Sequence, residues 1–209
     1  MAEQYLSAFG VDADVLLAVA GSHDEGLVRA ALGRIEELTE AGSLLRATGP
    51  AEVGAALREV VAGRPDPARP GGYTWLLELL GPVLGTPLGS AVLPGRHWDD
   101  LTDAFRVWGL PALAALWGRP WPFPAGAAAS ADDPWPFPSF TAAGELAVVR
   151  AELAGFDADR IHEDADLLPG GDDDAAEEVE ELVAEALPAW VDGALAAGRG
   201  LLLVRDGGR

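Results

Sequence analysis

A proline-rich stretch at residues 117–140 restricts the possible folds of this chain more than any other feature. It holds the tetrapeptide Trp-Pro-Phe-Pro twice, at residues 121–124 and 135–138. Prolines lack an N–H group and fix the backbone φ angle, so neither copy forms an α-helix or a central strand. We therefore expect this stretch, called the strap below, to join two helical parts of a single domain, residues 1–116 and residues 141–209.

The aromatic side chains of the strap have two possible roles. They belong to Trp121, Phe123, Trp135 and Phe137. If exposed, they would form a docking surface, because Trp and Phe are effective anchors and a proline-rich segment loses little entropy on binding. If buried, they would close the core between the two parts, and burying one large aromatic side chain stabilises a fold by about 2–3 kcal/mol. Burial is the favoured interpretation, since the chain has seven Trp residues to accommodate.

Apolar residues recur at helical spacing through most of the remaining chain. Helices are predicted near residues 12–19, 22–42, 51–61, 73–80, 98–108, 111–117, 141–156, 175–187 and, after a kink or restart at Pro188, up to residue 198. Short strands are predicted at residues 4–10 and 201–204, and we expect them to pair with each other because buried backbone groups need partners. The fold class is therefore mainly α, of the α+β type, with a small sheet that joins the N- and C-terminal strands.

Short polar side chains mark where several of these helices begin. Asp12 or Asp14 is the expected N-cap of the first helix, and Thr141 that of the helix after the strap. Ser22 is the expected N-cap of the second helix, since Glu25 stands three residues later, as in a capping box.

Two segments are expected to be irregular. Residues 81–94 are apolar but rich in Gly and Pro, which predicts a buried segment without regular structure. Residues 157–174 combine acidic side chains with Gly and Pro, which predicts an acidic loop.

The charge of the chain limits the class of its partners. There are 34 acidic and 14 basic residues, which gives a formal net charge of −20. A non-specific nucleic-acid binder has to neutralise phosphates, so this charge argues against nucleic acid and favours a basic protein as partner. All basic residues are Arg, which excludes a phosphate-loop Lys and a Schiff-base Lys. The absence of Cys excludes disulfides, thiolate nucleophiles and Cys-ligated metals.

The expected location is the cytoplasm. The N-terminal region carries acids at Glu3, Asp12 and Asp14 and lacks the positive charges of a signal peptide. The most apolar run, residues 76–94, is interrupted by Gly and Pro and is too broken to span a bilayer. We therefore expect no membrane partner, and the oligomeric state is left open.

An acidic run after the strap is the main candidate for partner binding. Its members are Asp172, Asp173, Asp174, Glu177, Glu178 and Glu181. A solvated helix face explains the run, since acids in a first helical turn suit the positive end of the helix dipole. The solvated face is the favoured interpretation, and docking of an Arg- or Lys-rich partner is the alternative. Both interpretations stay open.

Two histidines beside carboxylates form a weaker candidate, for a divalent metal ion. The candidate ligands are His97, His162, Asp164 and Asp166. Imidazole and carboxylate groups bind such ions, but a helix cap next to His97 and a solvated loop around His162 explain the same residues. The calcium-loop pattern fails, because Leu168 stands where that loop needs Glu. We expect no cofactor, with a divalent cation as the weak alternative.

The order of short motifs along the chain resembles a known kind of family. A GY-x-x-LLELLG helix at residues 72–81, a DDPWPFP strap, a TAAGE helix start and a final GRGLLLV strand follow one another. This order resembles an uncharacterised bacterial family found in GC-rich soil bacteria and, more weakly, the YfbM-like α+β proteins. The resemblance implies a cytoplasmic α+β domain and supplies no catalytic residue.

Three functions are compatible with these patterns. The first is a non-enzymatic acidic interaction protein, such as an immunity- or antitoxin-like factor that binds a basic protein. The second is a divalent-metal-dependent hydrolase that uses the two histidines and nearby Asp residues. The third is an accessory domain that is recruited through the strap. The high charge and the lack of a catalytic motif favour the first.

Overall fold

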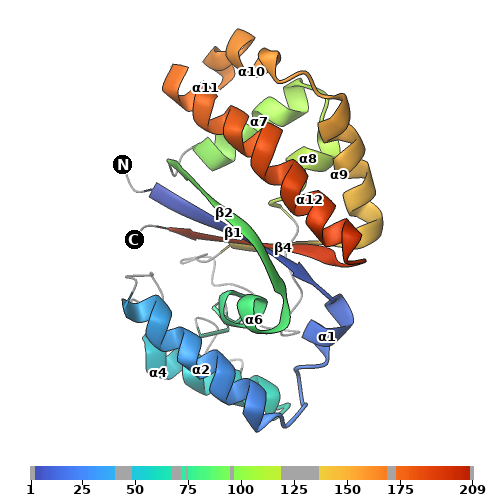
Figure 1. Cartoon of the computed structure of the whole chain (residues 1–209). Helices are drawn as coiled ribbons and strands as arrows, with labels where there is room; N and C mark the ends of the chain where they lie inside the picture. Colours follow the sequence, from blue (N-terminus) through green and yellow to red (C-terminus); the bar gives the residue numbers. More distant parts are fainter. Residues whose placement is uncertain are drawn as a thin grey trace.

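The computed structural model describes residues 3–40, 49–66, 72–73, 75–94, 97–118, 137–168 and 173–207. This part of the chain forms a four-stranded antiparallel sheet with helices on both faces (Figure 1). The strands are β1 (Glu3–Val11), β2 (Thr86–Pro94), β3 (Phe137–Thr141) and β4 (Gly200–Gly207), in the order β2-β1-β4-β3. The α+β fold class predicted from the sequence is confirmed.

The two terminal strands form the centre of the sheet. β1 and β4 pair antiparallel from Gln4 opposite Gly207 to Val11 opposite Gly200. The predicted pairing of the N- and C-terminal strands is therefore confirmed. Because helices cover both faces of this central pair, the apolar run at residues 201–204 has no polar alternation.

Alternate side chains of the central strands supply two separate cores. In β4, Leu201 and Leu203 pack into one core, while Leu202 and Val204 pack into the other. The same alternation occurs in β1, where Leu6 and Ala8 face one side and Phe9 and Val11 the other. This is the period-two geometry of a strand that is buried on both faces.

Two helical layers cover these faces (Figure 1). The first layer contains α1 (Ala13–Leu17), α2 (Glu25–Glu40), α4 (Pro50–Val61) and α6 (Leu76–Leu84). The second layer contains α7 (His97–Val107), α8 (Pro111–Ala114), α9 (Ala143–Gly155), α10 (Asp159–Glu163), α11 (Asp173–Glu180) and α12 (Leu187–Ala196). The helices therefore divide between residues 84 and 97, and not at the strap, because α7 and α8 pack with the C-terminal helices.

Residues 81–94 correct the prediction of a buried, irregular segment. The helix α6 continues through Pro82 to Leu84, Gly85 is its C-cap, and residues 86–94 form the edge strand β2. Prolines are tolerated at the ends of an edge strand, where the missing N–H group breaks no central ladder. Pro87 and Val92 are exposed rather than buried. The Gly and Pro content thus marks the edge of a sheet.

The start of α2 differs from the predicted capping box. The carboxylate of Asp24 accepts hydrogen bonds from the N–H groups of Gly26 at 2.8 Å and Leu27 at 3.0 Å, so Asp24 caps the helix. Ser22 lies two residues earlier and accepts from the N–H of Asp24 at 3.3 Å. A carboxylate directly before the first turn also has the more favourable interaction with the helix dipole.

The other two cap predictions have opposite outcomes. Asp12 is confirmed as the N-cap of α1, because its carboxylate accepts from the N–H of Asp14 at 2.9 Å. Thr141 does not cap α9, since it is the buried last residue of β3 and Ala142 precedes the helix. Pairing with Leu201 in β4 holds Thr141 in the sheet instead.

The acidic C-terminal region is more helical than predicted. The expected loop at residues 157–174 contains α10 and a 3-10 turn, η1 (Ala165–Leu167). At Pro188 the sequence predicts a kink or a restart, and the structure has a π-helical turn, η2 (Glu181–Ala186), directly before α12. A wider turn accommodates the missing N–H and the ring of proline without a break in the helix.

Among the described residues, no helix is both long enough and apolar enough to cross a bilayer.

Candidate functional site

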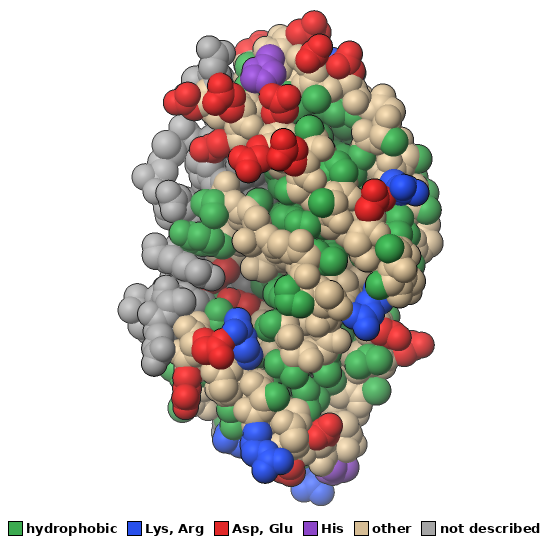
Figure 2. Space-filling view, in the orientation of Figure 1, with side chains coloured by type: hydrophobic (Ala, Val, Ile, Leu, Met, Phe, Trp, Pro, Cys, Tyr) green, Lys and Arg blue, Asp and Glu red, His purple; other side chains and the backbone are tan. Residues whose placement is uncertain are grey.

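A row of carboxylates runs along the exposed side of α11 and η2. We call Asp174, Glu177, Glu178, Glu181 and Glu185 the acidic stripe, and all five are exposed. The opposite side of the same helix is buried and consists of Ala175, Ala176, Val179, Leu182 and Val183. The stripe is therefore held in place by the core of the second layer. Acidic side chains gather around it in the upper part of the molecule (Figure 2).

Arg side chains pair with carboxylates elsewhere on the described surface, but not with the carboxylates of the stripe. In the first layer, Arg34 pairs with Glu37, and in the second layer Arg150 pairs with Asp192 at 2.6 Å. Within the described residues, no Arg forms an ion pair with a member of the stripe. Three like-charged pairs stand four residues apart, Asp174 with Glu178, Glu177 with Glu181 and Glu181 with Glu185. Each such pair destabilises a helix by about 0.2–0.5 kcal/mol.

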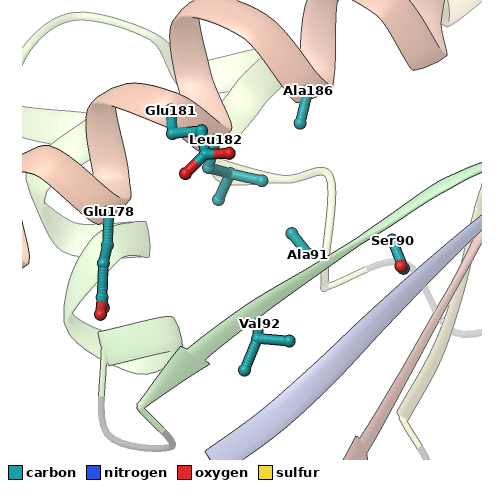
Figure 3. Close-up of a pocket in the computed structure, with 7 residues that line it drawn as sticks. All are labelled: Ser90, Ala91, Val92, Glu178, Glu181, Leu182 and Ala186. Carbon is teal, nitrogen blue, oxygen red and sulfur yellow. The ribbon is translucent and has the colours of Figure 1, made fainter.

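A groove lies between the stripe and the edge strand β2. It has a volume of about 380 Å³ and is lined by Ser90, Ala91, Val92, Glu178, Glu181, Leu182 and Ala186. Figure 3 shows Glu178 and Glu181 on the helical side and the three β2 residues on the other. One wall therefore carries negative charge, while the other presents small side chains and strand backbone. Such a groove suits an elongated ligand with positive charges along one side.

The β2 wall of the groove is shaped by an irregularity in the sheet. The pairing of β1 with β2 shifts register between Ala8 and Phe9, where Leu88 is the additional residue of β2. Gly89 follows with φ +152°, and a Cβ atom there would lie 2.4 Å from Nε1 of Trp190. Only glycine fits this close approach, so the Trp190 ring fixes the position of β2 beside the second layer.

Sequence reasoning found the acids of this site but missed its β2 residues. Four of the six predicted acids belong to the stripe: Asp174, Glu177, Glu178 and Glu181. Asp172 lies outside the described residues, and Asp173 is described only as the first residue of α11. Ser90, Ala91 and Val92 were missed because Gly and Pro around them argue against a strand. An uncharged apolar run with a proline near each end is itself a signal of an edge strand.

Of the four aromatic candidates in the strap, only Phe137 lies within the described residues. Trp121, Phe123 and Trp135 lie outside the described residues. Phe137 is half-buried at the start of β3, and the guanidinium of Arg205 lies 4.5 Å from its ring centre. The second copy of the tetrapeptide thus leads into an edge strand, in agreement with the exclusion of a central strand.

The metal candidates take part in other contacts. Nε2 of His162 lies 2.8 Å from a carboxylate oxygen of Glu180. Asp164 accepts a hydrogen bond from Nε1 of Trp108 at 2.9 Å and lies 3.6 Å from Arg160. The contact of His162 joins α10 to α11, and the contact of Asp164 with Trp108 joins the turn after α10 to the end of α7.

The other two metal candidates are Asp166 and His97. Asp166 is exposed in η1, and His97 opens α7 with a side chain outside the described set. Across the part of the chain that the structure describes, no group of three or more His, Cys, Asp or Glu side chains is arranged to hold a metal ion.

Buried polar side chains lie elsewhere in the fold. Tyr73 is 2% exposed, its hydroxyl accepts from the N–H of Asp66 at 2.5 Å and donates to the carboxylate of Glu59. Burial and the bond to Glu59 raise the pKa of Tyr73 to about 12. Asp206 is 6% exposed in β4, opposite Tyr5 of β1. Neither residue was singled out from the sequence, which gives no local sign of burial for an isolated Tyr or Asp.

Comparison with known proteins supplies a family but no activity. The family model described as "Domain of unknown function (DUF7691)" matches residues 2–205, nearly the whole chain. No curated protein and no solved structure matches. The expectation of an uncharacterised family is thereby confirmed.

Proposed function

Because the chain belongs to the DUF7691 family, whose function is unknown, we propose a function from the chemistry of its own surface. The protein is a non-enzymatic binding protein that docks a basic protein partner on the acidic stripe, in the manner of an immunity- or antitoxin-like factor. The observation that carries this proposal is the uncompensated stripe beside a groove.

The uneven distribution of charge supports a local docking surface. Residues 159–185 contain eleven described acidic positions in and around α10, α11 and η2, with Arg160 as the basic residue among them. The first layer mixes acids with Arg29, Arg34, Arg58 and Arg64. A concentrated field of one sign raises the association rate of an oppositely charged partner, and its effect weakens as salt increases.

The two other functions considered from the sequence, a metal-dependent hydrolase and an accessory domain recruited through the strap, stay predictions. The hydrolase depends on His97, and recruitment through the strap depends on Trp121, Phe123 and Trp135. The side chains of these residues lie outside the described part of the chain. No contact of a described residue favours either function over docking by the stripe.

A comparison of two triple variants tests the proposal. The stripe variant carries Glu177→Gln, Glu178→Gln and Glu181→Gln. The control variant carries Glu25→Gln, Glu36→Gln and Glu52→Gln, which removes the same charge from exposed positions of the first layer. Each tagged protein is used to capture partners from the native host at about 50 mM and about 500 mM salt, since screening differs strongly between these conditions. A captured protein is then purified, and its dissociation constant is measured against all three chains.

We expect a basic protein that binds the wild type and the control variant at low salt. The stripe variant should bind it at least about tenfold more weakly, since several charge pairs are lost together. Equal affinity of the purified partner for the stripe variant and the wild type would contradict the proposal, as would a captured partner without basic character.

A further inference from the structure

The edge strand β2 offers backbone as well as side chains to a ligand. It lies at the end of the strand order, and within the described residues only β1 pairs with it. Backbone N–H and C=O groups on the outer side of an edge strand provide a template for another strand. Natural edges are commonly blocked by charged residues, but residues 86–94 contain none. The unblocked length lies between the irregularity at Leu88 and Pro94.

The two faces of this edge differ in chemistry. Ala91 stands opposite Leu6, packs against the second layer and therefore lies on the side of the stripe. Val92 stands opposite Tyr5 on the other face of the sheet and is 44% exposed. A strand added next to β2 would place alternate side chains on these two faces. One set would meet the carboxylates of Glu178 and Glu181, and the other set would lie beside Val92.

We propose that an extended segment of the basic partner adds to the free edge of β2 as a further antiparallel or parallel strand. Its basic side chains alternate with apolar ones, so that Arg or Lys residues meet Glu178 and Glu181 while the apolar residues cover Val92. Main-chain hydrogen bonds supply affinity in this mode, and the alternating side chains supply selectivity. This inference rests on the proposed function and names the form of partner that it binds.

Charge decides which occupant fits the groove. A second copy of the chain carries a net charge of −20 and would bring its own acidic stripe toward the first if the two β2 edges paired. Like charges placed opposite each other across an interface oppose binding. A basic segment instead gives each groove carboxylate a counterion, which the described chain itself does not provide for Glu178 or Glu181.

Synthetic peptides and the full chain test this inference. The parent probe is a short capped peptide of alternating Arg and Val. A block peptide of the same composition, with all Arg before all Val, is the control for charge alone. Two further probes carry backbone N-methyl groups, one on every Arg and the other on every Val. Because alternate residues of a strand direct their N–H groups to opposite edges, only one of the two sets faces β2. Affinities are measured in about 50 mM salt, where surface charges are only weakly screened.

We expect the parent peptide to bind the wild type at least about tenfold more tightly than the block peptide. One N-methylated peptide should lose about tenfold in affinity, while the other should bind as the parent does. A variant with Glu178→Gln and Glu181→Gln should lose a similar factor, and the control variant should not. Hydrogen exchange of the complex should show slower exchange within residues 89–93.

Several results would overturn the strand-addition inference. Absence of parent binding, equal binding of the parent and block peptides, or equal binding of both N-methylated peptides would each do so. A stable dimer that is lost on a change in β2 would also do so, because it would assign the edge to a second copy. These outcomes leave the capture experiment with the triple variants unaffected, so failure of strand addition is distinguishable from failure of the acidic-docking function.

Discussion

Tyr73 shows how one buried hydroxyl links two segments of the first layer. Its hydroxyl joins the carboxylate of Glu59 in α4 to the backbone N–H of Asp66 in the following turn. Burial disfavours the phenolate, and the bond to Glu59 disfavours it further, so the pKa rises from 10.0 to about 12. The neutral hydroxyl is therefore part of the native hydrogen-bond network.

This pKa predicts a loss of stability in alkaline solution. Since the folded-state pKa lies above the unfolded-state value, the stabilisation is complete below pH 10 and is lost as the pH rises toward about 12. The maximum loss is about 2–3 kcal/mol, which corresponds to two pKa units. Urea unfolding of the wild type and Tyr73→Phe at a series of pH values measures it.

The Tyr73→Phe chain serves as the comparison for that measurement. It should lose about 1 kcal/mol at neutral pH with the two hydrogen bonds, and it should show a flatter decline in alkaline solution. Parallel curves for the two proteins above pH 10 would assign the decline to other groups.

Asp24 and Ser22 provide a second measurement at the scale of single residues. Asp24→Ala removes the acceptor for the N–H groups of Gly26 and Leu27, so we expect a loss of about 1 kcal/mol in the free energy of unfolding. Ser22→Ala removes one weaker contact and should cost less. Chemical denaturation of both variants compares them directly, and a larger loss for Ser22→Ala would restore Ser22 as the functional cap.

At the scale of whole elements, Glu152 joins two helices of the second layer. Its carboxylate in α9 accepts hydrogen bonds from the N–H groups of Ala112 at 3.0 Å and Leu113 at 2.8 Å. These groups belong to the first turn of α8, where no side chain of α8 itself forms a cap. A helix start leaves its first N–H groups without partners, so a residue from a distant helix satisfies them.

Removal of this contact should destabilise the second layer. We expect Glu152→Ala to reduce the free energy of unfolding by about 2 kcal/mol, because two bonds to a charged group are lost from a half-buried site. Glu152→Gln keeps an acceptor and should lose less. Glu163→Ala is the control, since Glu163 is exposed and a surface change of this kind has an effect within about 0.5 kcal/mol. Equal losses for Glu152→Ala and Glu163→Ala in urea unfolding would contradict this role.

At the scale of the whole molecule, the acidic stripe costs stability. The stripe variant removes all three like-charged pairs and part of the overall repulsion of a chain with a net charge of −20. We expect its free energy of unfolding to rise by about 0.5–1 kcal/mol at low salt, and the gain to shrink as salt increases. Thermal and urea unfolding at two salt concentrations measure this gain.

The control variant should behave differently in the same measurement. Glu25 and Glu52 lie in the first turns of α2 and α4, where negative charge suits the helix dipole, so their replacement should give no gain or a small loss. A stripe variant that is more stable than the wild type and yet binds its partner less well would show that the stripe is kept for binding. A stripe variant that is less stable than the wild type would remove this argument.

Local sequence patterns determined much of the fold. Period-two and unbroken apolar runs at the two ends predicted β1 and β4, and helical periodicity predicted the buried face of α4. Glu177, Glu178 and Glu181 were recognised as candidate binding residues, because the charge and spacing of a helix face depend on neighbouring residues alone. The absence of Lys and Cys excluded several kinds of chemistry without any structure.

Only the tertiary structure decided what lies beside these elements. Ser90 and Glu178 line one groove, and Glu152 meets Leu113, although each pair is distant in the sequence. The side of the sheet on which α7 lies, and the edge position that converts residues 86–94 into a strand, depend on packing over the whole chain. Local spacing specifies which face of an element is apolar, but it does not specify which partner covers that face. For this reason the charge of the candidate site was predictable, while the groove that gives it a shape was not.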